Sequence, residues 1–152
     1  MLDDTDWHIL TILQTEARLP FAELGRRVGL SPSSVAERVR KLEDSGIIVG
    51  YRAEINPGAI GLSLRILIDV ITTPQQYPQV IEFMEHCPAV QSAHHVTGNT
   101  SFRIEALVGS IAEVEPLIGK LSHYGQTTTS IVLSSPVRKT AIAPPGDIST
   151  TL

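Results

Sequence analysis

Two short helix patterns lie close together in residues 20–46, and the turn between them limits how the chain can fold. The first pattern follows Pro20 and ends at Gly29, because glycine accepts the left-handed backbone with which many helices terminate. The second begins with Ser31, which can cap a helix N-terminus, and Pro32, which fits the first helical position. The sequence therefore predicts two helices joined by a tight turn.

The second of these helices has one narrow apolar stripe. Val35, Val39 and Leu42 recur at helical spacing, so the helix is expected to pack on one side and to expose the other. Another helix pattern precedes the pair, with its N-cap at Asp3 and its spacing continuing to Ala17. The inward residues of the helix after Pro20 are expected to be Phe21, Leu24 and Val28. Two helices joined by a short turn are typical of the helix-turn-helix motif, whose second helix enters the major groove of DNA.

Cations gather on this pair of helices although the whole chain is acidic, with 12 Lys and Arg against 16 Asp and Glu. From Arg26 to Lys41 the only opposing carboxylate is Glu37. Arg and Lys side chains can reach phosphates or guanine, and the free N–H groups of a helix N-terminus bind phosphate. We therefore expect this surface to contact DNA. The predicted contact residues are Arg26, Arg27, Ser31, Ser33, Ser34, Glu37, Arg38, Arg40 and Lys41.

These residues are expected to contact different parts of the DNA. The residues predicted to approach base edges are Ser33, Ser34, Glu37 and Lys41. The four arginines are expected to hold phosphates or the local scaffold. In the alternative interpretation the basic run is an ordinary solvated face, with Arg38 paired to Glu43 or Asp44.

A change of pattern after the last of these helices predicts two domains. Apolar residues on both sides of Gly50 favour a two-stranded hairpin, or wing, over residues 48–55. A proline and two glycines then follow in residues 56–61, which is typical of a boundary. The predicted parts are a winged helix-turn-helix domain (1–55), a linker (56–62), a second domain (63–135) and a C-terminal tail (136–152) that is mobile or forms a short arm.

The second half of the chain alternates between strand and helix patterns. Strands are predicted at 62–72, 89–97, 101–109 and 127–135, and helices at 74–87 and 110–125. The order βαββαβ indicates a ferredoxin-like domain, with a four-stranded antiparallel sheet and two helices on one face. The whole chain is thus predicted to be α+β. Ser110 and Glu113 fit a capping box, and Pro116 is expected to kink the second helix or to delay its start.

One face of such a sheet is left uncovered. In the first strand Ile66 and Ile68 alternate with Leu67 and Ile71, so both faces of the strand are apolar. A second subunit would bury the face that the helices do not cover. The sequence therefore predicts a homodimer.

Composition narrows the class of protein. The single cysteine, Cys87, excludes an intramolecular disulfide and favours a reducing compartment. No apolar run of about 20 residues predicts a membrane span, and the acidic start of the chain does not resemble a signal peptide. A cytoplasmic protein is expected, and its acidic balance argues against coating nucleic acid indiscriminately.

The histidines do not predict a metal site. His94 and His95 are neighbours on a predicted strand and therefore point to opposite faces, where they cannot readily share one ion. One is expected to face the helices and the other the partner subunit. We predict no metal and no cofactor.

The first sixty residues resemble the N-terminal domain of the Lrp/AsnC family, the leucine-responsive or feast/famine regulators. The matching segments are LDDTDWHIL, ELGRRVGLS and RVRKLEDSGIIVGY, and the βαββαβ half resembles the ligand-sensing domain of the family. The resemblance implies a sequence-specific DNA-binding transcription regulator. It implies dimers that bind two half-sites about one helical turn apart and assemble further, commonly into octamers. It also implies an effector, usually an amino acid, that binds between dimers.

The resemblance also implies an effector site, in which this chain departs from the family. Where the family has G-D-x-D and T-x-T, the corresponding residues here are Gly98, Asn99, Thr100, Ser101, Thr127 and Thr129. Both acidic residues are replaced, by Asn99 and Ser101, although a carboxylate is the natural partner of an ammonium group. Three hypotheses follow: neutral oxygens hold the ammonium, the effector is not an amino acid, or the site is silent. These residues are also ordinary turn and strand residues.

Two other functions fit the same architecture. One is an architectural DNA-binding protein that needs no effector. The other is an enzyme similar to the sirohaem decarboxylases, which share this architecture. The aromatic motif of those enzymes is missing from residues 97–106, and the cationic helix favours DNA, so no enzymatic activity is expected.

Overall fold

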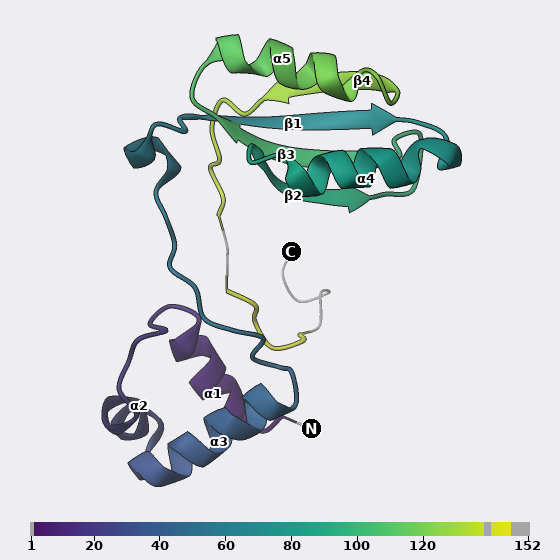
Figure 1. The fold of residues 1–152 in the computed structure, drawn as a ribbon. Helices are drawn as coiled ribbons and strands as arrows, with labels where there is room; N and C mark the ends of the chain where they lie inside the picture. The colour runs from purple at the N-terminus through teal and green to yellow at the C-terminus, as the bar shows by residue number, and fades with distance from the viewer. Residues whose placement is uncertain (1, 139–140, 147–152) are drawn as a thin grey trace. The chain divides into compact units, whose positions relative to one another are not determined.

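The structure is a computed structural model that describes residues 2–138 and 141–146. It divides into two compact units, one formed by Met1–Glu54 with Val137–Leu152 and the other by Ile55–Pro136. Figure 1 shows three helices in the first unit and a sheet with two long helices in the second. No helix within the described ranges is long and apolar enough to cross a membrane.

The first unit contains α1 (Asp4–Leu13), α2 (Phe21–Val28) and α3 (Pro32–Asp44). Asp3 caps α1 as predicted, because its carboxylate accepts from the Asp6 N–H at 2.8 Å while the Asp6 carboxylate accepts from the Asp3 N–H at 3.2 Å. The helix ends earlier than its spacing suggested, and Ala17 is exposed. The reason is a tight turn in which the N–H and hydroxyl groups of Thr15 both donate to the Ile12 carbonyl.

The core of this unit is small and wholly apolar. Its buried residues are Ile9, Leu10, Leu13, Leu24, Val35, Val39 and Leu42, which confirms the predicted stripe of α3. The prediction that Phe21 faces inward is wrong, since this side chain lies at the start of α2 and is largely exposed. Gly29 adopts the predicted left-handed backbone, with φ of 71°. Gly25 meets a second requirement, because a Cβ there would lie 2.5 Å from the Leu30 carbonyl oxygen.

The predicted wing is not formed. Residues 49–56 contain no helix or strand, and the N–H groups of Ile47 and Ile48 donate back to the Leu42 carbonyl at the end of α3. The Tyr51 hydroxyl donates to the Glu43 carboxylate at 2.9 Å, which ties this segment to α3. Burial and this hydrogen bond raise the pKa of Tyr51 to about 12. The backbone groups that a hairpin would pair are thus partly used at the helix end.

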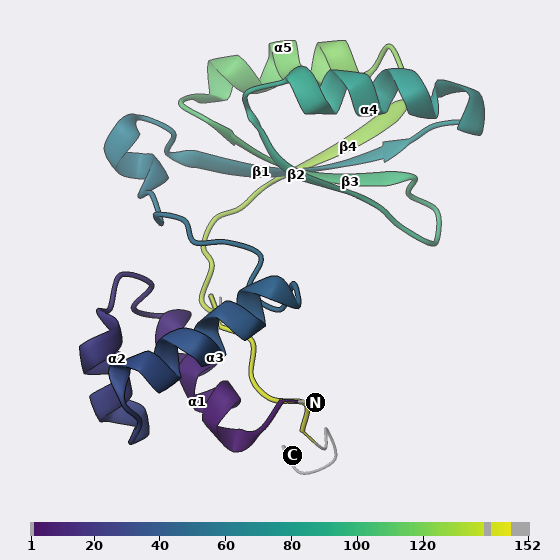
Figure 2. The same cartoon turned by 60° about the horizontal axis from the view of Figure 1, so that its bottom comes forward.

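The second unit has the predicted βαββαβ order. The elements are β1 (Leu64–Ile71), α4 (Tyr77–His86), β2 (Val90–His95), β3 (Phe102–Val108), α5 (Ile111–Leu121) and β4 (Gln126–Ile131), with short 3-10 turns η1 (Pro57–Ile60) and η2 (Pro74–Gln76). The sheet order is β2-β3-β1-β4, and all pairs are antiparallel. Figure 2 shows α4 and α5 together on one face of the sheet. The ferredoxin-like prediction is confirmed.

Two local predictions for α5 need correction. The helix starts at Ile111 despite Pro116, so of the two predicted effects of the proline, a kink or a delayed start, the delayed start is wrong. The capping box is displaced by one residue, because the Glu113 carboxylate accepts from the Gly109 N–H at 3.1 Å and the Ser110 side chain makes no cap bond.

The two faces of the sheet differ in composition. Ile66, Ile68 and Val70 of β1 are buried under the helices. The opposite face carries partly exposed Leu67 and Ile71, as predicted. The same face also carries two cross-strand ion pairs, Arg65 with Glu105 and Asp69 with Arg103. It is therefore amphipathic rather than purely apolar.

Candidate DNA-binding surface and effector site

The N-terminus of α3 is organised by serines. Ser31 is the N-cap, and its hydroxyl accepts from the Ser34 N–H at 3.2 Å. The same hydroxyl lies 3.0 Å from the Ser33 hydroxyl and 2.8 Å from the Ser34 hydroxyl. All three serines are exposed, so this end of the helix presents small hydroxyl groups and a positive dipole end to the solvent.

The next turns of α3 expose charged side chains. Lys41 lies 2.7 Å from Glu37, and Arg40 lies 3.5 Å from Asp44, each pair at i, i+4 spacing. Arg40 and Lys41 are 81% and 72% exposed in these pairs. Hydrogen bonding to Lys41 and its charge lower the pKa of Glu37. The residues predicted to approach base edges are thus all exposed, namely Ser33, Ser34, Glu37 and Lys41.

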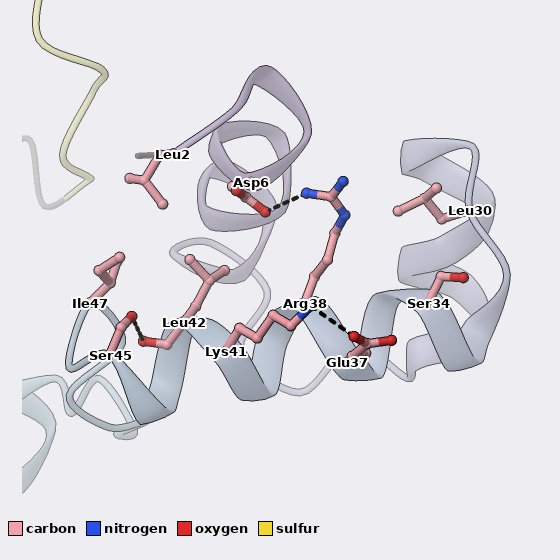
Figure 3. A pocket seen from close by; sticks show the side chains of 10 residues that line it. All are labelled: Leu2, Asp6, Leu30, Ser34, Glu37, Arg38, Lys41, Leu42, Ser45 and Ile47. Carbon is pink, nitrogen blue, oxygen red and sulfur yellow. Dashed lines mark hydrogen bonds and ion pairs between the residues drawn. The ribbon is translucent and has the colours of Figure 1, made fainter.

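A hollow of about 720 Å³ lies beside α3. Figure 3 shows the ten residues around it, which come from the start of α1, the α2–α3 turn, α3 and the segment after it. Leu2, Leu30, Leu42 and Ile47 contribute apolar surface to it. The other lining residues are Asp6, Ser34, Glu37, Arg38, Lys41 and Ser45.

Arg38 points across this hollow toward α1 instead of outward (Figure 3). Its guanidinium donates to Asp3 at 2.7 Å and to Asp6 at 2.8 Å, and its side chain is 34% exposed. The Asp6 N–H and then Arg38 lower the pKa of Asp3. Neither Glu43 nor Asp44, the partners considered from the sequence, holds Arg38 among the described contacts.

The two arginines of α2 share one carboxylate. Arg26 donates to Glu23 at 2.9 and 2.7 Å, and Arg27 donates to Glu23 at 3.1 Å and also to Glu16. Hydrogen bonds from Arg26 and then Arg27 lower the pKa of Glu23 to about 2. Arg26 remains 75% exposed, whereas Arg27 is 35% exposed.

Every cation of the basic run therefore has a carboxylate partner. Sequence reasoning missed most of these carboxylates because Asp3, Asp6, Glu16 and Glu23 lie before the run rather than inside it. Only the i, i+3 and i, i+4 spacings on α2 and α3 were visible signals. Any DNA phosphate must replace or join an existing carboxylate partner.

The residues of the predicted effector site lie at one end of the sheet. Gly98, with φ of 104°, and exposed Asn99 form the turn after β2, and half-buried Thr100 follows them. Thr127 pairs with Val70 on one side of β1, and the Ser101 N–H donates to the Val70 carbonyl on the other. The structure thus brings the turn and the start of β4 to the same end of β1.

The hydroxyl groups of this site differ in their bonding. The Ser101 hydroxyl accepts from the Thr72 N–H and donates to the Thr72 carbonyl, both at 3.0 Å. Thr127 and Thr129 lie on the helix-covered side of β4, opposite Val70 and Ile68 of β1. The Thr129 hydroxyl is buried and has no hydrogen-bond partner among the described residues.

The histidines are separated as predicted. The His95 ring lies 5.0 Å from Tyr77 and 5.1 Å from Phe102, measured between ring centroids, on the helix side of the sheet. His94 is opposite Arg103 and so faces the uncovered side. In the part of the chain that the structure describes, no group of three or more His, Cys, Asp or Glu residues gathers as a metal site.

Comparisons with known proteins match both units. Residues 2–43 match the AsnC-type helix-turn-helix domain, and residues 65–142 match the Lrp/AsnC ligand binding domain. The chain belongs to the Lrp/AsnC family of transcriptional regulators. This Lrp/AsnC regulator accordingly combines a DNA-binding helix-turn-helix with a ligand-binding domain.

Relatives of this Lrp/AsnC regulator align along most of its length. The HTH-type regulator YezC of Bacillus subtilis is 39% identical over 134 residues, covering 88% of this chain and 95% of that protein. The regulatory protein AsnC of Escherichia coli is 32% identical over 145 residues, covering 92% and 95%. A crystal structure of a Neisseria meningitidis transcriptional regulator in complex with L-Met has a TM-score of 0.88 at 31% identity, covering 93% of this chain and 96% of that one.

Proposed function

We propose that this regulator reads specific DNA sequences through the exposed face of α3. Ser33, Ser34, Glu37 and Lys41 approach base edges, and Arg40 binds phosphate. The observation that carries the proposal is the exposure of Arg40 and Lys41, each held by a single i, i+4 carboxylate. Exposed ion pairs contribute little to stability, so phosphate oxygens replace those carboxylates at small cost.

The remaining cations have different roles in this proposal. Arg26, which is more exposed than Arg27, binds backbone phosphate beside α3. Arg38 joins α3 to the start of α1, since both of its partners belong to the α1 capping box. Arg27 acts in the same way between α2 and Glu16.

Salt dependence of DNA binding tests these roles. An operator is first selected from random DNA, and its affinity is then measured across a salt series. Arg40→Ala is expected to flatten the slope by about one unit, because binding that has lost one phosphate contact releases about one counterion fewer. Arg38→Ala is expected to leave the slope unchanged, and Lys120→Ala on α5 is the matched control. An unchanged affinity and slope in both Lys41→Ala and Arg40→Ala would falsify the assignment of this face.

We also propose that an amino acid or related metabolite is the effector of the ligand-binding domain. The Neisseria meningitidis relative was crystallised with L-Met, and the turn and β4 of this chain lie at one end of the sheet. Neutral oxygens of Asn99, Thr100 and Thr127 hold the ammonium group. Ser101 supports the turn instead of contacting the effector, because its hydroxyl proton and one of its two acceptor lone pairs are already used on Thr72.

A thermal-shift screen of the twenty amino acids and related metabolites tests the effector. A ligand that binds only the folded state raises the melting midpoint, and the shift grows with the ratio of ligand concentration to Kd. The variant Asn99→Ala is expected to weaken the shift, whereas Asn56→Ala, which removes an asparagine before η1, is expected to leave it intact. A hit whose shift is unchanged by Asn99→Ala contradicts the proposed ligand set.

An effector-independent architectural protein is the second candidate. It is favoured by Ser101, whose place in the family is acidic and whose hydroxyl is committed to the sheet here. The two candidates differ in one observable, the footprint on DNA. A footprint that none of the screened metabolites changes supports the second candidate.

We propose that the uncovered face of the sheet is the interface through which the chain assembles. The proposed modules are residues 1–55 and 63–135, joined by 56–62 and followed by the tail 136–152. Partly exposed Leu67 and Ile71 on this face are buried in a homodimer, and dimers associate further into an octamer. Sedimentation tests this: Leu67→Glu is expected to give monomers, and Ile111→Glu on the exposed side of α5 is the control.

A further inference from the structure

The C-terminal arm, defined here as the described residues Val137–Arg138 and 141–146, makes a specific contact with α1. The Ile142 N–H donates to Gln14 Oε1 at 2.6 Å, and Gln14 Nε2 donates to the Ile142 carbonyl at 3.0 Å. One carboxamide thus satisfies both backbone groups of a single residue. An adjacent β-strand satisfies a residue in the same two-point manner.

The contact lies at the rim of an apolar groove within the first unit. The groove has a volume of about 340 Å³ and runs between α1 and the segment that follows α3. Trp7, Leu10 and Leu13 form its α1 side, and Ile142 lines it from the arm. From the other side it is lined by Ile47, Ile48, Val49, Gly50, Tyr51 and Arg52.

We infer that α1 carries a docking site for an extended peptide, and that its occupant is the C-terminal arm of the same chain. The recognition is of backbone, because Ile142 as a whole is 74% exposed while its N–H and carbonyl groups are both bound. The arm is suited to this, since Pro144 and Pro145 restrict its backbone and lower the entropy lost on docking.

Docking gives the chain a second connection to the DNA-binding helices. The first runs from α3 through η1 into β1. The second leaves β4 at Ile131 and reaches α1 at Ile142, eleven positions later in the sequence. Within the first unit, Gln14 therefore holds the arm that follows β4 in the sequence.

Amide exchange of the full-length protein tests the docking site directly. In the wild-type chain the Ile142 amide is expected to exchange about fivefold to tenfold more slowly than an unprotected amide of the same sequence, since one net hydrogen bond is worth that factor. Gln14→Ala is expected to abolish this protection. Gln14→Glu keeps an acceptor for the Ile142 N–H but loses the donor, so it is expected to keep part of it.

Controls separate docking from general effects on the fold. Gln126→Ala, which removes an exposed glutamine from β4, is expected to leave Ile142 protected. Trp7 is the only tryptophan of the chain and lines the groove, so its fluorescence reports on docking. Its emission should shift to longer wavelength in Gln14→Ala and stay unchanged in the control Gln126→Ala. An unprotected Ile142 amide in the wild-type chain, or protection that survives Gln14→Ala, overturns the proposal.

A mixing experiment decides which copy supplies the arm. The Gln14→Ala chain has an intact arm and no docking carboxamide, whereas a chain ending at Pro136 has the carboxamide and no arm. Ile142 of the first chain is expected to stay unprotected when the two are co-assembled. Restored protection would mean that the arm docks on a neighbouring subunit, and would overturn docking within one chain.

Discussion

The polar side chains of the two proposed sites are held in different ways. On α3, Arg40 and Lys41 lie in the solvent and each pairs with one exposed side chain on its own helix. Near the turn after β2, the Ser101 hydroxyl bonds to both backbone groups of Thr72 and is partly buried. A phosphate can replace the first kind of partner, but a ligand cannot replace the second without opening the end of the sheet. Side chains whose ion-pair partners can be exchanged are suited to binding, whereas side chains bonded to the backbone support the fold.

The largest effect is expected where partners exchange most easily. The double variant Arg40→Ala and Lys41→Ala should weaken specific DNA binding by about tenfold or more, and the lost phosphate contact of Arg40 should flatten the salt slope by about one unit. The melting midpoint should change little, because exposed ion pairs contribute little. Fluorescence anisotropy and calorimetry measure the two quantities. A large loss of stability with intact DNA binding would reverse the roles assigned to these side chains.

Ser101→Ala should do the opposite. It leaves the N–H and carbonyl of Thr72 without their side-chain partner, which costs about 1–3 kcal/mol of unfolding free energy. DNA affinity below the melting range should be unchanged. Urea unfolding is the measurement, and Ser130→Ala, on exposed β4, is the control. If Ser101→Ala unfolds like the wild-type chain while effector binding is lost, Ser101 is a ligand contact and the comparison fails.

Thr129 differs from both groups, because its buried hydroxyl has neither kind of partner among the residues that the structure describes. Thr129→Val removes a hydroxyl that was desolvated without compensation, so it should stabilise the unliganded protein by up to about 1 kcal/mol. If the Thr129 hydroxyl forms a hydrogen bond with the bound effector, the effector-induced thermal shift should be smaller in the same variant. Thr128→Val, on the opposite face of β4, should leave that shift unchanged. A destabilised Thr129→Val protein would show that the hydroxyl has a partner.

The smallest effect is expected from pH. The pKa of Glu23 falls from 4.5 to about 2 because Arg26 and Arg27 bind its ionised form. A lowered folded-state pKa adds stability above pH 4.5 that is lost as pH falls toward 2. In Glu23→Gln the melting midpoint should therefore depend less on pH in that window. Glu115→Gln on α5 is the control. If the wild-type chain, Glu23→Gln and Glu115→Gln have identical pH profiles, Arg26 and Arg27 do not stabilise the fold through Glu23.

Local signals predicted more than distant ones did. The Ser31 cap, the stripe of α3 and the βαββαβ order depend on residues a few positions apart, and the structure confirms all three. The partners of Arg38 lie more than thirty positions away, and Ile142 lies 128 positions from Gln14. Such contacts depend on how separate elements pack against each other, and this packing cannot be predicted from the periodicity of the sequence.

The wing failed for a related reason. Apolar residues around Gly50 have the alternation of a hairpin, but the end of α3 uses the N–H groups of Ile47 and Ile48, and Glu43 binds Tyr51. Propensity for a strand was outweighed by tertiary contacts. The commitment of Ser101 to Thr72 was equally invisible, because a serine in a turn has no distinctive pattern.

Gly25 has a consequence for how such a regulator acquires new targets. A Cβ at Gly25 would lie 2.5 Å from the Leu30 carbonyl oxygen and 3.4 Å from the Ser31 carbonyl carbon, so α2 packs closely on the backbone of the turn that leads into α3. This close packing needs a glycine and does not involve the exposed side chains at the start of α3. Under the proposed base contacts of Ser33 and Ser34, substitutions at these two positions change the preferred bases without altering this packing. Divergence of operator sequence then requires few mutations, provided that position 25 remains glycine.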